Sequence, residues 1–181
     1  MGDVVELTRG SETVETADDV RLDLVVGALV DRADRRAASD VSFELELERT
    51  VVGGDPERIS RAVSNLLDNA GRWSPPGGVV EVSLHGGILT VRDHGPGFEE
   101  RDLPHVFERF YRSERARSTP GSGLGLAIVH QAADAHGGFA QARNAPGGGA
   151  LLRVGFGTPQ DVQETPEIAS LDHVTSPSER A

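Results

Sequence analysis

Cysteine and lysine are both absent from this chain of 181 residues. Without cysteine the protein has no disulfide, no thiolate zinc site and no cysteine nucleophile, which fits a reducing compartment. All 18 basic residues are arginine. A P-loop, a protein-kinase strand lysine and a Schiff-base enzyme each need a lysine, so these chemistries are excluded. A phosphate ligand would have to be bound by arginine side chains and backbone amides.

Other signals are missing as well. There is no run of about 18 apolar residues and no charged-then-apolar leader, so we expect neither a membrane span nor a secretory signal. We therefore expect a cytoplasmic chain, with any membrane anchor on a longer parent protein. The net charge of −11 argues against nucleic acid or an anionic membrane as the main partner. The six histidines lack metal-ligand spacing and no serine lies in a G-x-S-x-G turn, which leaves hydrolase chemistry without support.

Apolar periodicity predicts three helices. The first covers residues 23–37 and follows a short strand. The second begins at Asp55, which caps it ahead of a proline, and ends at Trp73 before a Ser-Pro-Pro-Gly-Gly stop. The third begins near Gly123 or Leu124 and ends at a Gly-Gly pair. The residues that it is expected to bury are Leu124, Ile128, Val129 and Ala132.

Alternating patterns predict the strands. Residues 43–47 alternate apolar side chains with glutamates, which is typical of a strand with one acidic, solvent-facing side. Two hairpins are expected, over residues 80–91 and 139–156. The predicted fold is α+β: a two-layer sandwich in which a mixed, mostly antiparallel sheet carries about three helices on one face.

The chain divides into one domain and two appendages. Residues 1–12 are interpreted as the remnant of a preceding helix or a lead-in, and residues 158–181 as a disordered C-terminal tail, because the tail is proline-rich, acidic and weakly apolar. Residues 13–157 form the expected domain. Within it, residues 98–120 have no sustained period and mix arginines with acids, which predicts a mobile lid.

A pair of asparagines on the second helix predicts a cation site. At about 100° per residue, Asn65 and Asn69 lie on one stripe at the margin of the buried face, where a cleft would open. Asn69 would offer a neutral carbonyl oxygen to Mg²⁺ already held by the phosphates of ATP. By itself, an N-x-x-x-N pattern is more often a pair of caps or local hydrogen bonds.

Asp93, followed by His-Gly-Pro-Gly, predicts a purine site. Gly95 and Gly97 allow positive φ or close approach of a ligand to the backbone. An ionised aspartate only accepts hydrogen bonds, which suits the amino group of adenine and not the carbonyl of guanine. ATP is therefore favoured over GTP, although a bare D-x-G-x-G is most often a simple turn.

Alternating glycines at positions 121, 123 and 125 predict a phosphate site. Their spacing does not match a dinucleotide fingerprint, which needs G-x-G-x-x-G after a strand. A helix N-terminus with exposed amides fits instead, and it would bind the β- and γ-phosphates. In the lid, Arg109 and Arg112 could neutralise phosphate charge, although exposed arginines are usually solvated.

Four motifs now stand in order along the chain: Asn65-Leu-Leu-Asp-Asn69-Ala, Asp93-His-Gly-Pro-Gly97, Phe107-Glu-Arg-Phe110 and Gly121-Ser-Gly-Leu-Gly-Leu126. Together they resemble the N, G1, F and G2 boxes of sensor histidine kinases of two-component systems, in the superfamily shared with gyrase, Hsp90 and MutL ATPases. The resemblance covers residues 14–156 and implies a Bergerat-type ATP-binding fold.

The resemblance also implies roles for particular residues. Asn69 would be the Mg²⁺ ligand, with Asn65 a possible catalytic contributor, and Asp93 would bind adenine. Arg72 matches the family's basic phosphate ligand and Trp73 its aromatic residue beside the base. The residues that would shape the base pocket or hold the phosphates are Gly95, Gly97, Gly121, Gly123, Leu124, Gly125 and Leu126.

One part of the family's pattern is missing, and one matching position distinguishes the chain from the superfamily's ATPases. The family's phosphoacceptor box, a histidine followed by glutamate and Thr-Pro, is absent, so we expect a monomeric catalytic fragment that acts on a histidine of a separate dimerisation domain, with a response regulator downstream. Asn65 stands where the superfamily's ATPases tend to have glutamate, and an amide cannot deprotonate water. Two alternatives stay open: an ATPase of the same superfamily, or a nucleotide-gated binding module without kinase activity.

Overall fold

The computed structural model of the chain describes residues 18–36, 41–118 and 121–157. The predicted lead-in of residues 1–12 and tail of residues 158–181 lie outside this part. The elements are β1 (Asp18–Arg21), α1 (Leu22–Arg36), β2 (Val41–Leu47), β3 (Val51–Gly54), α2 (Pro56–Trp73), β4 (Gly78–His85), β5 (Ile88–Arg92), the 3₁₀ turns η1 (Leu103–His105) and η2 (Arg115–Ser118), α3 (Gly125–Ala135), β6 (Phe139–Asn144) and β7 (Ala150–Gly155).

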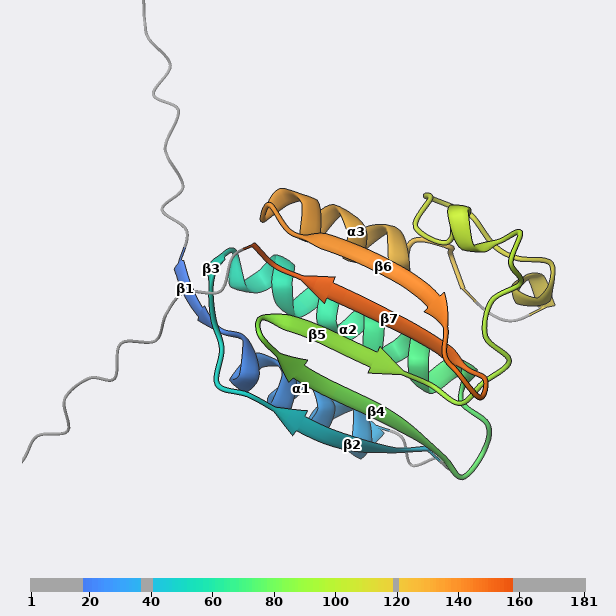
Figure 1. Cartoon of the computed structure of the whole chain (residues 1–181), viewed down its shortest axis with the longest axis horizontal. Coiled ribbons are helices and arrows are strands. Elements are labelled where there is room, and N and C mark those ends of the chain that lie inside the picture. Colours follow the sequence, from blue (N-terminus) through green and yellow to red (C-terminus); the bar gives the residue numbers. More distant parts are fainter. Residues whose placement is uncertain (1–17, 37–40, 119–120, 158–181) are drawn as a thin grey trace, which may run out of the picture.

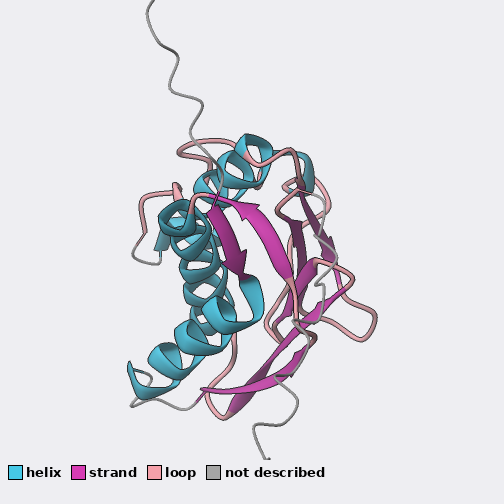
Figure 2. Cartoon of the chain, turned by 90° about the vertical axis from the view of Figure 1, so that its left-hand side faces the viewer, coloured by secondary structure: helices cyan, strands magenta, loops and turns pink. Residues whose placement is uncertain are grey.

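The strands and helices form two layers. Five strands lie in the order β2-β4-β5-β7-β6, with β2 parallel to β4 and the other neighbours antiparallel. The helices α1, α2 and α3 cover one face of this sheet (Figures 1 and 2), while β1 and β3 pair separately. The predicted α+β sandwich is confirmed. Within the described residues, every helix is too short or too polar to cross a bilayer.

The central helix α2 follows its sequence signals closely. The Asp55 side chain accepts hydrogen bonds from the backbone amides of Glu57 and Arg58, which caps the helix start, and Pro56 occupies the first position. Its end is capped where the Ser74 amide donates to the Ala70 carbonyl. The buried side chains are those that the periodicity predicts: Ile59, Ala62, Val63, Leu66, Leu67 and Ala70.

The two predicted hairpins are also confirmed. The β4–β5 hairpin turns at Gly86-Gly87, where both residues have positive φ, 54° and 77°. The β6–β7 hairpin closes the sheet. Alternate residues of β4, β5 and β7 face the helices and complete the core: Val80, Val82, Leu84, Leu89, Val91, Leu152 and Val154.

Three features differ from the sequence-based expectations. The strand β3 was not predicted, because it is short and ends in two glycines and is defined by pairing with β1. Leu45 is 43% exposed although it follows the apolar alternation, since β2 is an edge strand. The predicted burial of Leu124 and Ile128 is wrong. Both are only partly buried, whereas the predicted burial of Val129 and Ala132 is confirmed. The phase of α3 places Ala127 and Ala133 beside these two residues on the buried face.

A histidine ties the start of α2 to the end of α3. The ring of His136 donates from Nδ1 to the carbonyl of Ala132 (2.6 Å) and accepts at Nε2 from the amide of Asp55 (2.9 Å). These two partners require the neutral ring with its proton on Nδ1. The ring also contacts Phe156 edge-on, with centroids 6.1 Å apart. A Cβ on Gly54 would overlap this ring, so a glycine is needed there.

Gly71 is the one glycine inside α2, and its replacement by alanine is expected to stabilise the fold. A Cβ there meets only the Phe43 ring at 3.9 Å, an ordinary contact. Helix propensity should then raise the free energy of unfolding by about 0.5–1 kcal/mol. Urea unfolding followed by far-UV circular dichroism measures the change. Gly54→Ala is the opposite case and should destabilise; equal effects of both variants would contradict the packing described.

Candidate functional site

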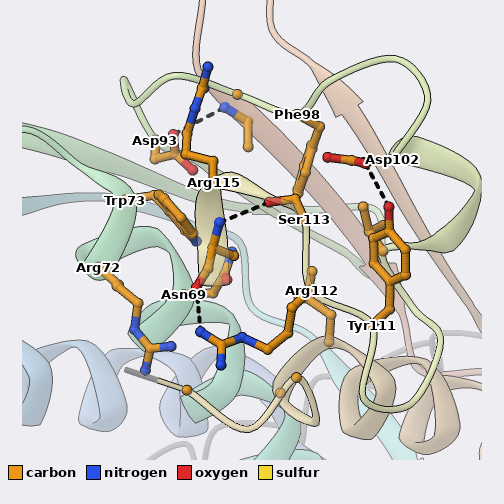
Figure 3. Close-up of a pocket in the computed structure, with 18 of the residues that line it drawn as sticks. Asn69, Arg72, Trp73, Asp93, Phe98, Asp102, Tyr111, Arg112, Ser113 and Arg115 are labelled. Carbon is orange, nitrogen blue, oxygen red and sulfur yellow. Dashed lines mark hydrogen bonds between the residues drawn. The ribbon is translucent and has the colours of Figure 1, made fainter. Parts of the chain in front are cut away.

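A cavity lies where the second half of α2, the ends of β5 and β7, and residues 97–116 meet the turn before α3 (Figure 3). Most of the residues singled out from the sequence line it, although they come from four separate segments. They are Asn65, Asn69, Arg72, Trp73, Asp93, Gly97, Arg112, Gly121, Gly123, Gly125 and Leu126.

Three of the residues singled out do not line this cavity. Gly95 is outside the lining, because it packs against the backbone of Trp73 at the end of α2. Arg109 and Leu124 line a second hollow between α2, α3 and Phe110, where Arg109 donates to the side chain of Gln131 (3.3 Å). Their predicted contacts with phosphate therefore have no geometric support in this arrangement.

Asp93 is the buried acid of the cavity. It follows the last residue of β5 and is 2% exposed. Its Oδ1 atom accepts hydrogen bonds from the backbone amides of Gly95 (2.8 Å) and Ala150 (3.1 Å). Within the described residues nothing donates to Oδ2. One oxygen thus fixes the carboxylate while the other is left to accept from a ligand.

Glycines allow the backbone to close around Asp93. A Cβ on Gly95 would overlap the carbonyl oxygen of Trp73, so the turn after Asp93 lies directly on the end of α2. Gly149 has φ of 88°, and a Cβ there would overlap the Asp93 carbonyl. On the far side of the turn, Asn144 accepts from the Phe98 amide (2.7 Å) and donates to its carbonyl (2.9 Å). The wall of the cavity beside Asp93 is therefore held by close backbone contacts and by the Asn144 side chain.

Two asparagines of α2 line the wall opposite. Asn65 donates from Nδ2 to the Arg61 carbonyl (2.8 Å), and its Oδ1 lies against Gly125 at the start of α3. Asn69 is partly buried, and its Nδ2 atom is buried without a hydrogen-bond partner. An unpaired buried amide is costly, so a polar ligand at this point would relieve the cost.

Residues 121–125 lead into α3, and three of the five are glycines, which place no side chain beside their backbone amides. Gly123 has φ of 72°. Arg72 extends from the end of α2 toward this turn: a Cβ on Gly121 would be 2.7 Å from its guanidinium. A guanidinium beside the exposed amides of a helix N-terminus is a favourable surrounding for a phosphate.

Residues 98–118 fold over the cavity with only short 3₁₀ turns. Tyr111 donates to Asp102 (2.6 Å), and this hydrogen bond to a carboxylate raises the pKa of the Tyr111 hydroxyl. Arg112 donates to the carbonyl of Ala116, whose amide donates to the Ser113 hydroxyl (3.2 Å). The predicted lid thus has a defined structure across the cavity, and its mobility stays a prediction.

Several lining residues were not singled out from the sequence. Ala150 contributes a backbone amide, which has no side-chain signature. Asp102 and Tyr111 lie in a stretch without periodicity, and their pairing appears only when the chain folds. Phe98, Ser113 and Ala116 also line the cavity.

The donors present fit a nucleotide with a divalent cation. In the part of the chain that the structure describes, no group of three histidine, aspartate or glutamate side chains could hold a metal. A hard cation would then take most of its ligands from phosphates and water, as Mg²⁺ usually does with nucleotides. Asn69 would supply one neutral oxygen, and Asp93 would face the base.

This fold and cavity define the class. The chain belongs to the histidine kinase-, DNA gyrase B- and HSP90-like ATPase family, whose model matches residues 54–160, more than half of the chain.

Individual relatives are sensor kinases. The chain is 46% identical over 143 residues to the signal transduction histidine-protein kinase/phosphatase MprB of Mycolicibacterium smegmatis, a match that covers 76% of this chain and 29% of that protein. It is 44% identical over 154 residues to the MprB of Mycobacterium ulcerans, covering 82% and 30%. The chain spans about three tenths of the length of these curated relatives.

Solved structures agree. The mycobacterial sensor histidine kinase MprB is similar with a TM-score of 0.72 and 41% identity, covering 79% of this chain and 100% of that chain. The ATP binding domain of PrrB from Mycobacterium tuberculosis has a TM-score of 0.56 and 30% identity, covering 79% and 99%.

Gly95→Ala is expected to disrupt the wall of the cavity beside Asp93. The added methyl would overlap the Trp73 carbonyl, so the turn after Asp93 must move away from α2. We expect the free energy of unfolding to fall by about 1–3 kcal/mol and nucleotide affinity to fall with it. Thermal melts and ATP titration measure the two effects. Gly71→Ala serves as the control, and an unchanged affinity in Gly95→Ala would contradict the described packing.

Proposed function

We propose that this chain binds Mg-ATP in the cavity and presents the γ-phosphate to a histidine on a dimerisation domain that is not part of it. The observation that supports this most is the convergence of Asn69, Asp93 and the glycine turn on one cavity. The three groups differ in chemistry and match the cation, the base and the phosphates in turn.

The proposed partners follow from the reaction. A phosphohistidine kinase needs a histidine nucleophile placed in line with the γ-phosphate, and such a histidine would come from the dimerisation domain of a parent kinase. The phosphate would then pass to a response regulator. The related proteins named MprB are described as kinase and phosphatase, and we extend the kinase half of that description to this chain. The chain itself is proposed to be a cytoplasmic monomer.

The electrostatics favour a triphosphate in spite of the net charge of −11. Arg72 and Arg112 both line the cavity, together with the amides of residues 121–125. Local arginines and oriented amides act at contact distance, whereas the solvent-accessible acids, including Asp68 and Glu99 of the lining, are screened by solvent and salt.

The ATP titration is the first test, and Asp93 variants give its sharpest form. Asp93→Ala should weaken ATP binding by at least about tenfold, because a hydrogen bond to a charged group is lost. Asp93→Asn can still accept from Gly95 and Ala150 but turns an NH₂ toward the base, so its preference for ATP over GTP should shrink. Calorimetry with both nucleotides measures this. An unchanged preference in Asp93→Asn would exclude the assigned base contact.

The same titration, performed with and without Mg²⁺, tests the proposed role of Asn69. Asn69→Ala should bind ATP with little dependence on Mg²⁺, since the only proposed protein ligand of the ion is removed. Titrations with and without excess EDTA compare the variant with the wild type. A full Mg²⁺ effect in the variant would remove Asn69 from the proposal.

The hydrolysis rates of Asn65 variants distinguish a kinase from the alternative function, an ATPase. Slow hydrolysis is expected of the isolated chain, because an amide cannot act as a general base. Asn65→Glu should raise the hydrolysis rate on the order of tenfold or more, while Asn65→Gln, of equal length, should not. Phosphate release measures the rates, and phosphohistidine formation on an added histidine-bearing helix hairpin tests the transfer. Rapid hydrolysis by the wild type without transfer would favour the ATPase.

A further inference from the structure

The start of residues 98–118 contains a buried acid. Asp102 is 5% exposed and is one of the few buried polar side chains in the described residues. Its amide donates to the Glu99 carbonyl (2.8 Å), and its own carbonyl accepts from the His105 amide (2.9 Å). The local turn thus fixes where the carboxylate lies, at the rim of the cavity.

Tyr111 returns to this acid from nine residues further on. Its hydroxyl donates to Asp102 Oδ1 at 2.6 Å, a short distance typical of a bond to a carboxylate. The His105 ring lies beside the tyrosine ring, with centroids 5.4 Å apart. Figure 3 shows the pair at the side of the cavity opposite Arg72 and Asn69. This hydrogen bond joins the two ends of the segment 102–111, so the position of Tyr111 is fixed relative to Asp102.

The backbone of Phe110 and Tyr111 lies directly against the glycine turn. The Phe110 amide donates to the Gly123 carbonyl (3.0 Å). A Cβ on Gly123 would be 2.9 Å from the Phe110 carbonyl carbon and from the Tyr111 carbonyl oxygen. Phe110 itself has φ of 65°, a conformation that side-chain-bearing residues rarely adopt. Neighbouring contacts must therefore hold it in place.

The geometry points to Asp102 and Tyr111 as positioning residues that hold the glycine turn of residues 121–125 in the arrangement that receives the β- and γ-phosphates. The inference rests on the proposed function. The hydrogen bond between the two side chains fixes the backbone of residues 110–111, and this backbone contacts the glycine turn. The pair should therefore affect binding of the phosphates. The contacts of Asp93 at the base end do not depend on the pair. Affinity for a triphosphate should therefore depend on the pair, and affinity for a ligand without phosphates should not.

Nearby ion pairs offer a matched control. Arg101 bonds Glu114 (3.1 Å) and Glu99 (2.9 Å) in the same stretch, but all three side chains are solvent-accessible. Exposed pairs of this kind contribute little. Glu114→Gln removes the negative charge from one of these exposed contacts without touching the Asp102–Tyr111 bond.

The experiment compares ATP with adenosine. Tyr111→Phe removes one hydroxyl and should weaken Mg-ATP binding on the order of tenfold, as expected for a hydrogen bond to a charged group, and leave adenosine binding within about twofold. Asp102→Ala should match it, and the double variant should lose no more than either single one. Asp102→Asn, which still accepts from the hydroxyl, should recover most of the ATP affinity. Glu114→Gln should behave as the wild type.

A spectroscopic measurement reports the pair separately. Tyr111 is the only tyrosine in the chain, so its ionisation can be followed by ultraviolet absorbance without interference from others. Asp102 raises the pKa of this hydroxyl, and Asp102→Ala should return it toward the ordinary value of about 10. This readout does not need a nucleotide.

Each outcome decides the question. Selective loss of ATP affinity, with the tyrosine titration shifted, supports the inference. Equal losses of affinity for ATP and adenosine, or losses of both that follow a lowered Tm, would show that the hydrogen bond has only a structural role. Either result would overturn the inference. No loss in either would also overturn it. A wild type that binds no Mg-ATP would instead refute the proposed function, even if the tyrosine titration still showed the pair to exist.

Discussion

One buried carboxylate organises the site. Asp93 is a charge removed from water, and such a group is tolerated in a protein interior when hydrogen bonds compensate it. Two backbone amides do so, one close in sequence and one distant: Gly95 two residues later, and Ala150 at the start of the last strand. The site can therefore form only when β7 has paired with β5, which makes the cavity around Asp93 a consequence of pairing between distant strands and not of a local turn.

The same constraint explains where glycine is required. The backbones of Trp73, Asp93 and residue 149 lie too close together for side chains at Gly95 and Gly149. At the other end, Gly123 must admit the backbone of residues 110–111. These glycines serve close approach, whereas Gly71 has room for a methyl group. Glycines that look alike in the sequence thus differ in function, and the difference appears only in the packing.

Sequence signals predicted most of the fold because they are local. Asp55-Pro56 and Ser74-Pro-Pro mark the ends of α2, and a Gly-Gly pair marks the first hairpin, whatever surrounds them. The buried face of α3 was harder to predict, because the helix has apolar residues on two stripes. Periodicity alone could not decide that Leu124 and Ile128 face the second hollow. Strand β3, the Ala150 amide and the Asp102–Tyr111 bond depend on partners distant in sequence, so no local pattern announces them.

The site also shows how an acidic chain can offer a place to a triphosphate. Four acids line the cavity, and they differ in burial. Asp93 and Asp102 are buried, and each carboxylate accepts hydrogen bonds, from two backbone amides and from a phenol respectively, whereas Asp68 and Glu99 are solvent-accessible. Arg72 and the open amides of residues 121–125 are left to set the local potential there. In a narrow cavity such nearby groups outweigh the net charge, because the surface glutamates of β2 lie on the far edge of the sheet and are screened by solvent.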